Sequence, residues 1–195
     1  ADYVQAHMSG AMIFESYRRY IPWLVSQAPQ DGLILEFGVA GGHSIRHIAA
    51  AAQPRLVHGF DSFEGLPEDW AGHLESRGAF SQKRKLPRVP SSVALHVGWF
   101  NDTLPGFLKD HPGPISLLHI DCDLYSGTKY ILDTAGDRLR PGSVILFDEY
   151  FNYPSWREHE YKAWQEFVAA RRVKYSYIAF TAVDGCVAVK IESIG

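Results

Sequence analysis

The chain has 195 residues and a formal net charge of -3, with 46% hydrophobic and 21% charged residues. This composition is that of a folded protein rather than a disordered one, and the length suits one domain, 1–195, with a sizeable core. The charge lacks the basic excess typical of nucleic-acid binding, and no apolar run approaches the length that spans a bilayer. Neither nucleic acid nor membrane is therefore expected as a partner.

The elements are predicted from hydrophobic periodicity, in chain order. Residues 1–31 are expected to form an N-terminal helical segment, after which short apolar runs alternate with helix-like stretches. The apolar runs predicted as strands are Leu33–Val39, Leu56–Ser62, Val93–Phe100, Ile115–Asp121 and Val144–Asp148. The predicted helices are Ser44–Ala52, Leu104–Asp110, Gly127–Leu139 and Glu158–Arg172.

Two further alternating runs, Tyr175–Ala182 and Cys186–Glu192, close the chain and are joined by Asp184-Gly185, a dipeptide typical of hairpin turns. Strands that alternate with helices predict an α/β fold, with a mostly parallel sheet covered on both faces and a C-terminal antiparallel hairpin. In such sheets ligands bind beyond the carboxyl ends of the strands.

The segment 63–92 does not fit this alternation, because it is long, polar and rich in glycine, proline and charge. Two interpretations stay open for it. It is either a solvated surface loop with a helix or two, or an insertion that acts as a lid over a binding site.

The stretch LEFGVAGGHS, residues 35–44, places Gly38 and Gly42 at a strand-to-helix turn. Glycines let the backbone approach a ligand, and the following helix N-terminus attracts an anion. Glu36 ahead of them suits a ligand with an ammonium group and would repel a pyrophosphate, unless it is simply a surface acid in a tight turn. Ser44 is a candidate donor to the ligand's carboxylate, a helix cap, or both.

The next two strand ends extend this site. Asp61, followed by Ser62, ends the second strand, where an acid commonly binds ribose hydroxyls. Trp99, Phe100 and Asn101 end the third strand and are suited to wall and hydrogen-bond an adenine, although core packing explains Trp99 equally well. An amino acid, a ribose and an adenine laid across a sheet describe S-adenosylmethionine.

The fourth and fifth strands both end in paired acids, Asp121 with Asp123 and Asp148 with Glu149. Acids at a strand end repel one another unless a cation lies between them. If these strands are neighbours, Asp121 converges with Asp148 and Glu149. Three carboxylates are suitable ligands for Mg2+ or another divalent cation, with water and substrate oxygens completing the octahedron.

The ordered motifs LEFGVAGG, GFDSFEGLP, GWFNDTLP, LLHIDCDLYSGT and ILFDEY resemble the macrocin O-methyltransferase (TylF-type) family, roughly over residues 32–167. Its members are class I, S-adenosylmethionine-dependent and metal-dependent O-methyltransferases of small molecules, including antibiotic sugars. The resemblance implies a single-domain Rossmann-like fold with a seven-stranded sheet, the cofactor over strands one to three and the ion over strands four and five. It assigns the metal to Asp121, Asp148 and Glu149, with Asp121 also beside the cofactor.

The sequence leaves three candidates for the general base. The more distantly similar catechol-type enzymes carry a lysine three positions after the first metal acid, where this chain has Leu124. The remaining candidates for the catalytic base are Asp121, in a dual role, and Asp123, with His119 a weaker third. Asp123 serves equally well as a cap for the following helix, and a structural role is the more common one for a histidine such as His119.

The expected function is S-adenosylmethionine- and Mg2+-dependent methylation of a hydroxyl on a small molecule, a sugar or another natural-product intermediate. The alternatives are a catechol or phenol O-methyltransferase, a nicotinamide-dependent oxidoreductase, which leaves the strand-end acids unexplained, and a binding module without activity. Self-association into a homo-oligomer is also open. The 2 cysteines, Cys122 and Cys186, show neither a disulfide framework nor a zinc spacing, and no signal-peptide pattern is present, so a cytoplasmic location is expected.

Overall fold

The computed structural model describes residues 2–182 and 185–195 and is built on an 8-stranded sheet with the order β1-β7-β8-β6-β5-β2-β3-β4. The strands are β1 (Met12–Phe14), β2 (Leu33–Phe37), β3 (Val57–Asp61), β4 (Val93–Val97), β5 (Ile115–Ile120), β6 (Val144–Phe147), β7 (Lys174–Thr181) and β8 (Val187–Ser193). The pairs that β8 makes with β6 and β7 are antiparallel, and the other pairs are parallel.

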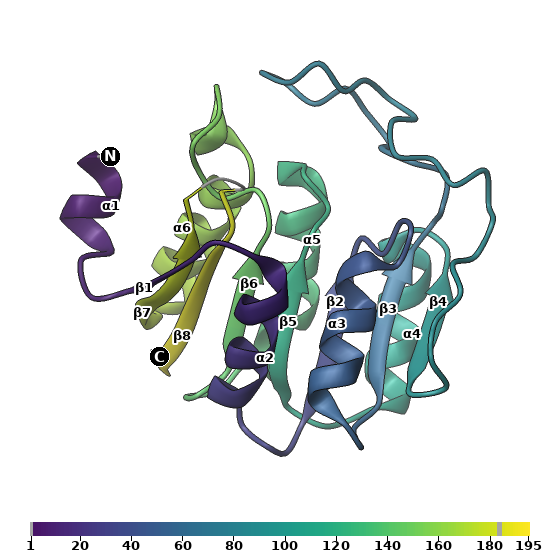
Figure 1. Ribbon diagram of the computed structural model, residues 1–195, viewed down its shortest axis with the longest axis horizontal. Coiled ribbons are helices and arrows are strands. Elements are labelled where there is room, and N and C mark those ends of the chain that lie inside the picture. The colour runs from purple at the N-terminus through teal and green to yellow at the C-terminus, as the bar shows by residue number, and fades with distance from the viewer. Residues whose placement is uncertain (1, 183–184) are drawn as a thin grey trace.

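Helices cover both faces of this sheet (Figure 1). One face carries α2 (Tyr17–Gln27) and α3 (His43–Ala52), and the other carries α4 (Phe100–Asp110), α5 (Tyr125–Ala135) and α6 (Glu160–Arg171). The remaining elements are α1 (Asp2–His7) and the short 3-10 helices η1 (Gly136–Arg138) and η2 (Trp156–Glu158). The predicted α/β class and its mostly parallel sheet are confirmed.

Strand β5 shows why the sheet has two cores. All of its residues are buried, and successive side chains point to opposite faces. Leu118 and Ile120 join the apolar cluster beneath α4, α5 and α6, whereas Leu117 joins the cluster beneath α2 and α3. His119 therefore faces α2 and α3 together with Leu117, and this placement matters for the site described below.

The structure differs from the sequence-based expectation near the N-terminus. The segment 1–31, predicted to be helical, forms α1 and α2 but also contains β1, which adds one strand to the seven that were predicted. This strand pairs in parallel with β7, with Ile13 opposite Phe180. A strand of three residues leaves almost no periodic signal, and it exists because the edge of β7 offers unpaired backbone groups. Of the predicted hairpin turn, Asp184 lies outside the described residues.

Residues 63–92 form an extended loop that contains neither helix nor strand, rather than the helix or two that were considered. In Figure 1 this loop extends beyond the strand ends at the top of the molecule. Leu66 and Trp70 anchor it by packing, almost fully buried, with Leu124 at the start of α5.

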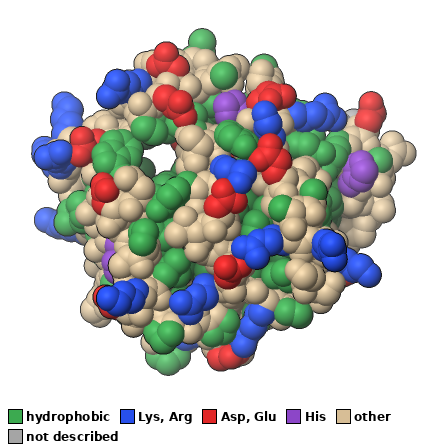
Figure 2. Space-filling model, turned by 180° about the vertical axis from the view of Figure 1, so that it is seen from behind, with side chains coloured by type: hydrophobic (Ala, Val, Ile, Leu, Met, Phe, Trp, Pro, Cys, Tyr) green, Lys and Arg blue, Asp and Glu red, His purple; other side chains and the backbone are tan. Residues whose placement is uncertain are grey.

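The surface seen in Figure 2 mixes acidic and basic side chains, so that this face carries no patch of a single sign. This agrees with the small net charge of -3. Among the described residues, none of the helices is both long and apolar enough to cross a membrane.

Three neighbouring histidines near the β4 edge predict an acid-sensitive fold. His58 is 5% exposed, and its Nδ1 lies 3.1 Å from Nε2 of His96, with the His111 ring at 5.1 Å. Burial, with the positive charge of His96 and His111, lowers the pKa of His58 from 6.5 to about 4. Below pH 6.5 the unfolded chain therefore binds a proton at His58 that the folded chain does not, and the contribution of His58 to stability falls as the pH drops toward 4.

We expect the wild type to lose up to about 2 kcal/mol of unfolding free energy through His58 between pH 7.5 and pH 5.0. Urea unfolding of wild type and variant at both pH values measures this loss as a difference between the two proteins, because Asp121 and Asp123, whose pKa values are raised, act in the opposite direction over the same range. On going from pH 7.5 to pH 5.0, His58→Gln should change in stability by about 2 kcal/mol less unfavourably than the wild type, whereas His7→Gln, at an exposed position, should change as the wild type does. The same pH dependence in His58→Gln and wild type would show that His58 does not contribute.

Candidate active site

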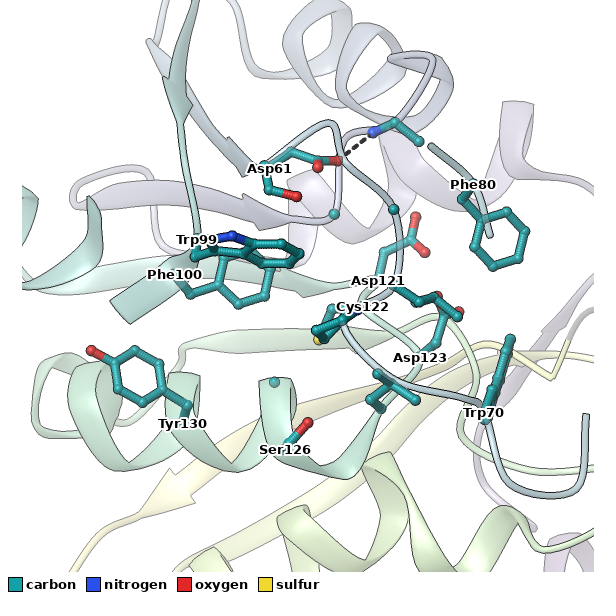
Figure 3. Close-up of a pocket in the computed structure, with 18 of the residues that line it drawn as sticks. Asp61, Trp70, Phe80, Trp99, Phe100, Asp121, Cys122, Asp123, Ser126 and Tyr130 are labelled. Atoms are coloured by element: carbon teal, nitrogen blue, oxygen red, sulfur yellow. Dashed lines mark hydrogen bonds between the residues drawn. The ribbon is translucent and has the colours of Figure 1, made fainter. Parts of the chain in front are cut away.

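A cavity of about 540 Å³ lies at the carboxyl ends of β2, β3, β5 and β6, a size typical of small-molecule sites. In Figure 3, Trp99 and Phe100 stand on one side of it and Trp70 and Phe80 on the other, with Asp121 between them. The loop 63–92 thus supplies one aromatic wall and the N-terminal end of α4 supplies the other. Both walls suit a flat, partly apolar ligand.

Most of the residues predicted from the sequence line this cavity: Gly38, Asp61, Ser62, Trp99, Phe100, Asn101, Asp121, Asp123, Asp148 and Glu149. The predicted residues Glu36, Gly42 and Ser44 are not part of this lining. Cavity residues that the sequence did not single out include Trp70, Phe80 and Tyr130. Their sequence context offered no signal, because they come from a loop without periodicity and from the middle of a helix.

The turn between β2 and α3, residues 38–42, is called the glycine turn. It depends on a close approach between the ends of β2 and β5. Gly38 has a φ of +92°, and a Cβ built on it would collide with the backbone carbonyl of Asp121. The N–H of Asp121 also donates to the carbonyl of Phe37 at 2.8 Å. Only glycine fits at position 38, since both its backbone conformation and its neighbour exclude a side chain.

Asp61 holds this turn in place. Its Oδ2 accepts hydrogen bonds from the backbone N–H groups of Val39 (2.8 Å) and Ala40 (2.7 Å), and its Oδ1 accepts one from Phe63 (2.6 Å). Figure 3 draws Asp61 with one of these bonds. Asp61 also faces the cavity, where its remaining lone pairs are available to a ligand. Its predicted contact with ribose hydroxyls stays a prediction.

Glu36 lies beneath α3 rather than in the cavity. It is fully buried, its Oε1 accepts a hydrogen bond from Ser44 Oγ at 3.0 Å, and its Oε2 lies 3.1 Å from His119 Nδ1. This geometry differs from the predicted contacts of Glu36 and Ser44 with a cofactor's ammonium and carboxylate groups. The alternation of side chains along β2 directs Glu36 to the same face as Ile34, where it meets its register partner His119 on β5.

Two acids of the cavity have strongly perturbed proton affinities. Burial raises the pKa of Asp121 to about 6, opposed by the charge of His119 and assisted by Glu36 and Asp61. Burial raises the pKa of Asp123 to about 8, with further contributions from the charges of Asp121 and Glu75. Asp123 has a left-handed φ of 64°, and the following helix has Leu124, not Asp123, at its N-cap without a side-chain capping bond.

The predicted metal ligands Asp121 and Asp148 do come together, and His119 joins them. One potential ligand atom from each of these side chains lies within 4.8 Å of the others, and His119 Nε2 is 3.8 Å from Asp148 Oδ1. Asp148 also accepts a hydrogen bond from the hydroxyl of Tyr17 on α2. The site thus joins β5 and β6 to α2.

Glu149, the third predicted ligand, lines the cavity but is not part of this group among the described residues. Both Asp148 and Glu149 line the cavity, but of the two only Asp148 contributes a ligand atom to this group. The backbone N–H of Glu149 donates to Oε2 of Glu160 at 3.1 Å. Glu160 is fully buried, which together with Asp148 and Asp123 raises its pKa well above the ordinary value.

The anchor of the loop 63–92 leads to a prediction about proteolysis. Trp70 is 3% exposed, and its ring stacks on His73 at 3.7 Å. Trp70→Ala should release the loop and speed tryptic cleavage near Lys83–Lys85 by about tenfold. If the variant lowers the free energy of local opening by about 1.4 kcal/mol, the population of the open, cleavable loop rises tenfold. Leu74→Ala, at a fully exposed position, is the control and should cleave like the wild type. Equal cleavage of both variants would mean that Trp70 does not anchor the loop.

Comparison with known proteins shows a methyltransferase-domain family model matching residues 35–150. One relative is a tetracenomycin-C 4'-O-methyltransferase from Streptomyces olivaceus, whose full name specifies an 8-demethyl-8-(2,3-dimethoxy-α-L-rhamnosyl) compound. It is 30% identical to this chain, and the alignment covers 61% of this chain and 53% of the relative. Demethyldecarbamoylnovobiocin O-methyltransferase from Streptomyces niveus is 28% identical over 67% of this chain and 53% of its own. The chain spans about half the length of these curated relatives.

Solved structures share the fold at lower identity. The calicheamicin methyltransferase CalS11 superposes with a TM-score of 0.68 at 24% identity. The superposition covers 89% of this chain and 77% of the CalS11 chain. The O-methyltransferase NovP superposes with a TM-score of 0.62 at 22% identity, covering 90% and 79%. These structures show that the fold is shared. The family match favours a methyltransferase over the oxidoreductase alternative, while the narrower TylF-type assignment stays a prediction. Because that match covers residues 35–150, more than half of the chain, the chain belongs to the methyltransferase-domain family.

Proposed function

We propose that this protein transfers a methyl group from S-adenosylmethionine to a hydroxyl of a small natural-product intermediate, with a sugar as the first candidate. The observation that carries the proposal is the convergence of a glycine turn, an aromatic wall and the acids of β5 and β6 in one cavity. The names of the relatives support the choice of acceptor, since one specifies a rhamnosyl compound and a solved structure is titled a TDP-rhamnose 3'-O-methyltransferase.

The cavity lining supports the adenine and ribose part of this proposal. Trp99 and Phe100 offer ring faces for an adenine, and Asp61 with Ser62 offers oxygen atoms for ribose hydroxyls. Bound S-adenosylmethionine would supply an activated methyl group. The chain's own contribution is to hold the acceptor hydroxyl in line with that group, which lowers the barrier by several kcal/mol, on the order of 7–11 in ideal cases.

A divalent ion fits the meeting point of Asp121 and Asp148, because two carboxylates there repel each other without a cation. The carboxylates alone favour Mg2+, and a bound ion would orient the acceptor hydroxyl and lower its pKa.

We assign the role of proton acceptor to Asp123. Its side chain lines the cavity next to Asp121, is 9% exposed and sits on a left-handed backbone, the kind of strain that clusters at functional sites. A carboxylate held in so dry a place binds a proton more strongly than an exposed one.

The test is a methyl-transfer assay with isotope-labelled S-adenosylmethionine against a panel of nucleotide deoxysugars, rhamnosylated natural products and catechols, with and without EDTA. We expect a product heavier by one methyl group from a sugar-bearing acceptor and loss of that product with EDTA. Turnover of catechols alone would favour the phenol alternative. Failure to bind S-adenosylhomocysteine in a calorimetric titration would contradict the proposal whatever the acceptor.

A further inference from the structure

We propose that His119 is itself a ligand of the divalent ion, so that the centre consists of His119, Asp121 and Asp148 and prefers Mn2+ or Co2+ to Mg2+. This inference deepens the proposed function and rests on its metal dependence. It departs from the all-carboxylate set of Asp121, Asp148 and Glu149 that the sequence predicts.

The first observation is an imidazole nitrogen that needs a partner. His119 is fully buried, and its Nε2 has no hydrogen-bond partner among the described residues. A buried polar atom left without a partner costs about 1–3 kcal/mol, so native proteins rarely retain one without a use. This nitrogen lies 3.8 Å from Asp148 Oδ1, at the mouth of the two-acid cluster.

The second observation is spacing. Two ligand atoms that share one ion at about 2.1 Å each lie roughly 3 to 4 Å apart, depending on the coordination angle. The 3.8 Å separation of His119 Nε2 and Asp148 Oδ1 falls in this interval, and the Asp121 carboxylate lies within 4.8 Å of both. An ion placed among the three would share Asp148 Oδ1 with the hydroxyl of Tyr17 and the thiol of Cys186, which already donate to it.

The third observation is the support behind the imidazole. His119 Nδ1 lies 3.1 Å from Glu36 Oε2, and Ser44 Oγ donates to the other oxygen of Glu36 at 3.0 Å. A histidine that binds a metal through one nitrogen commonly donates its other N–H to a carboxylate, which sets the tautomer and turns the ring toward the ion. Glu36 is in this position, and Ser44 fixes Glu36.

The ligand chemistry then decides the choice of ion. Mg2+ prefers oxygen ligands, whereas imidazole nitrogen binds transition ions more strongly. One nitrogen and two carboxylates accept Mn2+ or Co2+ readily. The carboxylate of Glu149 is not part of the cluster among the described residues, whereas the imidazole of His119 is.

The experiment titrates Mn2+ into metal-free protein and follows it by electron paramagnetic resonance, with pulsed measurements that detect nitrogen bound to the ion. We expect the wild type to bind Mn2+ at least tenfold more tightly than Mg2+ and to show a histidine nitrogen coupling that changes frequency when the histidines carry 15N. His119→Gln should abolish this coupling and weaken Mn2+ binding at least tenfold. Glu149→Gln should change the Mn2+ affinity less than threefold.

Glu36→Gln tests the positioning role separately. It should keep the nitrogen coupling but weaken Mn2+ binding by about tenfold, in line with the loss of a supporting partner behind a metal ligand. If His119→Gln fails to fold, the 15N-histidine comparison in the wild type still decides between a centre with an imidazole ligand and an all-carboxylate centre. S-adenosylhomocysteine binding, measured on the same samples, reports whether each variant retains the cofactor site.

Two results would overturn the inference in different ways. Mn2+ binding without histidine coupling, together with a large loss in Glu149→Gln, would restore the all-carboxylate centre and leave the proposed function intact. No binding of Mn2+ or Mg2+ by the wild type would remove the metal from the proposed function as well.

Discussion

Asp148→Ala is expected to lower metal-dependent methyl transfer by about 10³-fold while changing S-adenosylhomocysteine affinity only a few-fold. Asp148 belongs to the cluster with His119 and Asp121 at the end of β6, whereas the proposed cofactor contacts come from the ends of β2, β3 and β4. A metal ion contributes several kcal/mol of charge stabilisation, and each 1.4 kcal/mol corresponds to about tenfold in rate.

The measurement is the initial rate with saturating acceptor and added divalent ion, next to a calorimetric titration of S-adenosylhomocysteine. Asp133→Ala is a suitable control, because Asp133 is exposed on α5 and paired with Lys129. Its rate should equal that of the wild type. Full activity of Asp148→Ala in the presence of EDTA would eliminate the metal role.

Gly38→Ala should destabilise the fold by about 3 kcal/mol or more and abolish cofactor binding. A left-handed backbone at a non-glycine residue costs on the order of 1–3 kcal/mol, and the new Cβ would also overlap the Asp121 carbonyl. To relieve that overlap, the ends of β2 and β5 must separate, and the hydrogen bond from Asp121 to Phe37 would be lost. Both the sheet and the site are therefore affected.

Thermal unfolding measures the effect, and for a chain of this size 3 kcal/mol corresponds to a fall in Tm of roughly 6–12 °C. Gly41→Ala is the matched control in the same turn, because its Cβ would meet nothing within 4 Å and its φ is not in the left-handed region. It should stay within about 1 kcal/mol of the wild type. Equal stability of both variants would show that the approach of β2 to β5 is not required.

The positions of strands and helices were largely predictable, because short apolar runs alternating with amphipathic stretches leave a strong periodic signal. The predicted runs Ile115–Asp121 and Val144–Asp148 correspond to β5 (Ile115–Ile120) and β6 (Val144–Phe147). Since parallel strands place their carboxyl ends at one edge, Asp121 was expected to converge with Asp148 if the two strands were neighbours, and the pairing of β5 with β6 supplies that condition.

The face of the sheet on which an individual side chain lies was not predictable in the same way. Glu36 and Ser44 belong to a motif that suggested a cofactor contact, yet in the structure they pack with His119 beneath α3. Which face of a strand a residue occupies depends on register with its neighbours, and the pairing of Glu36 with His119 joins residues 83 apart in the chain. No local pattern carries such information.

The amino-acid sequence by itself determined the layered α/β architecture, the edge at which the site lies and the acids that converge there, because these follow from local periodicity and from the geometry of parallel strands. Tertiary structure alone decided that β1 adds an edge strand, that the loop 63–92 supplies an aromatic wall, and that His119 rather than Glu149 stands beside Asp121 and Asp148. These depend on contacts between residues far apart in the chain, where side-chain direction and packing, not composition, select the partner.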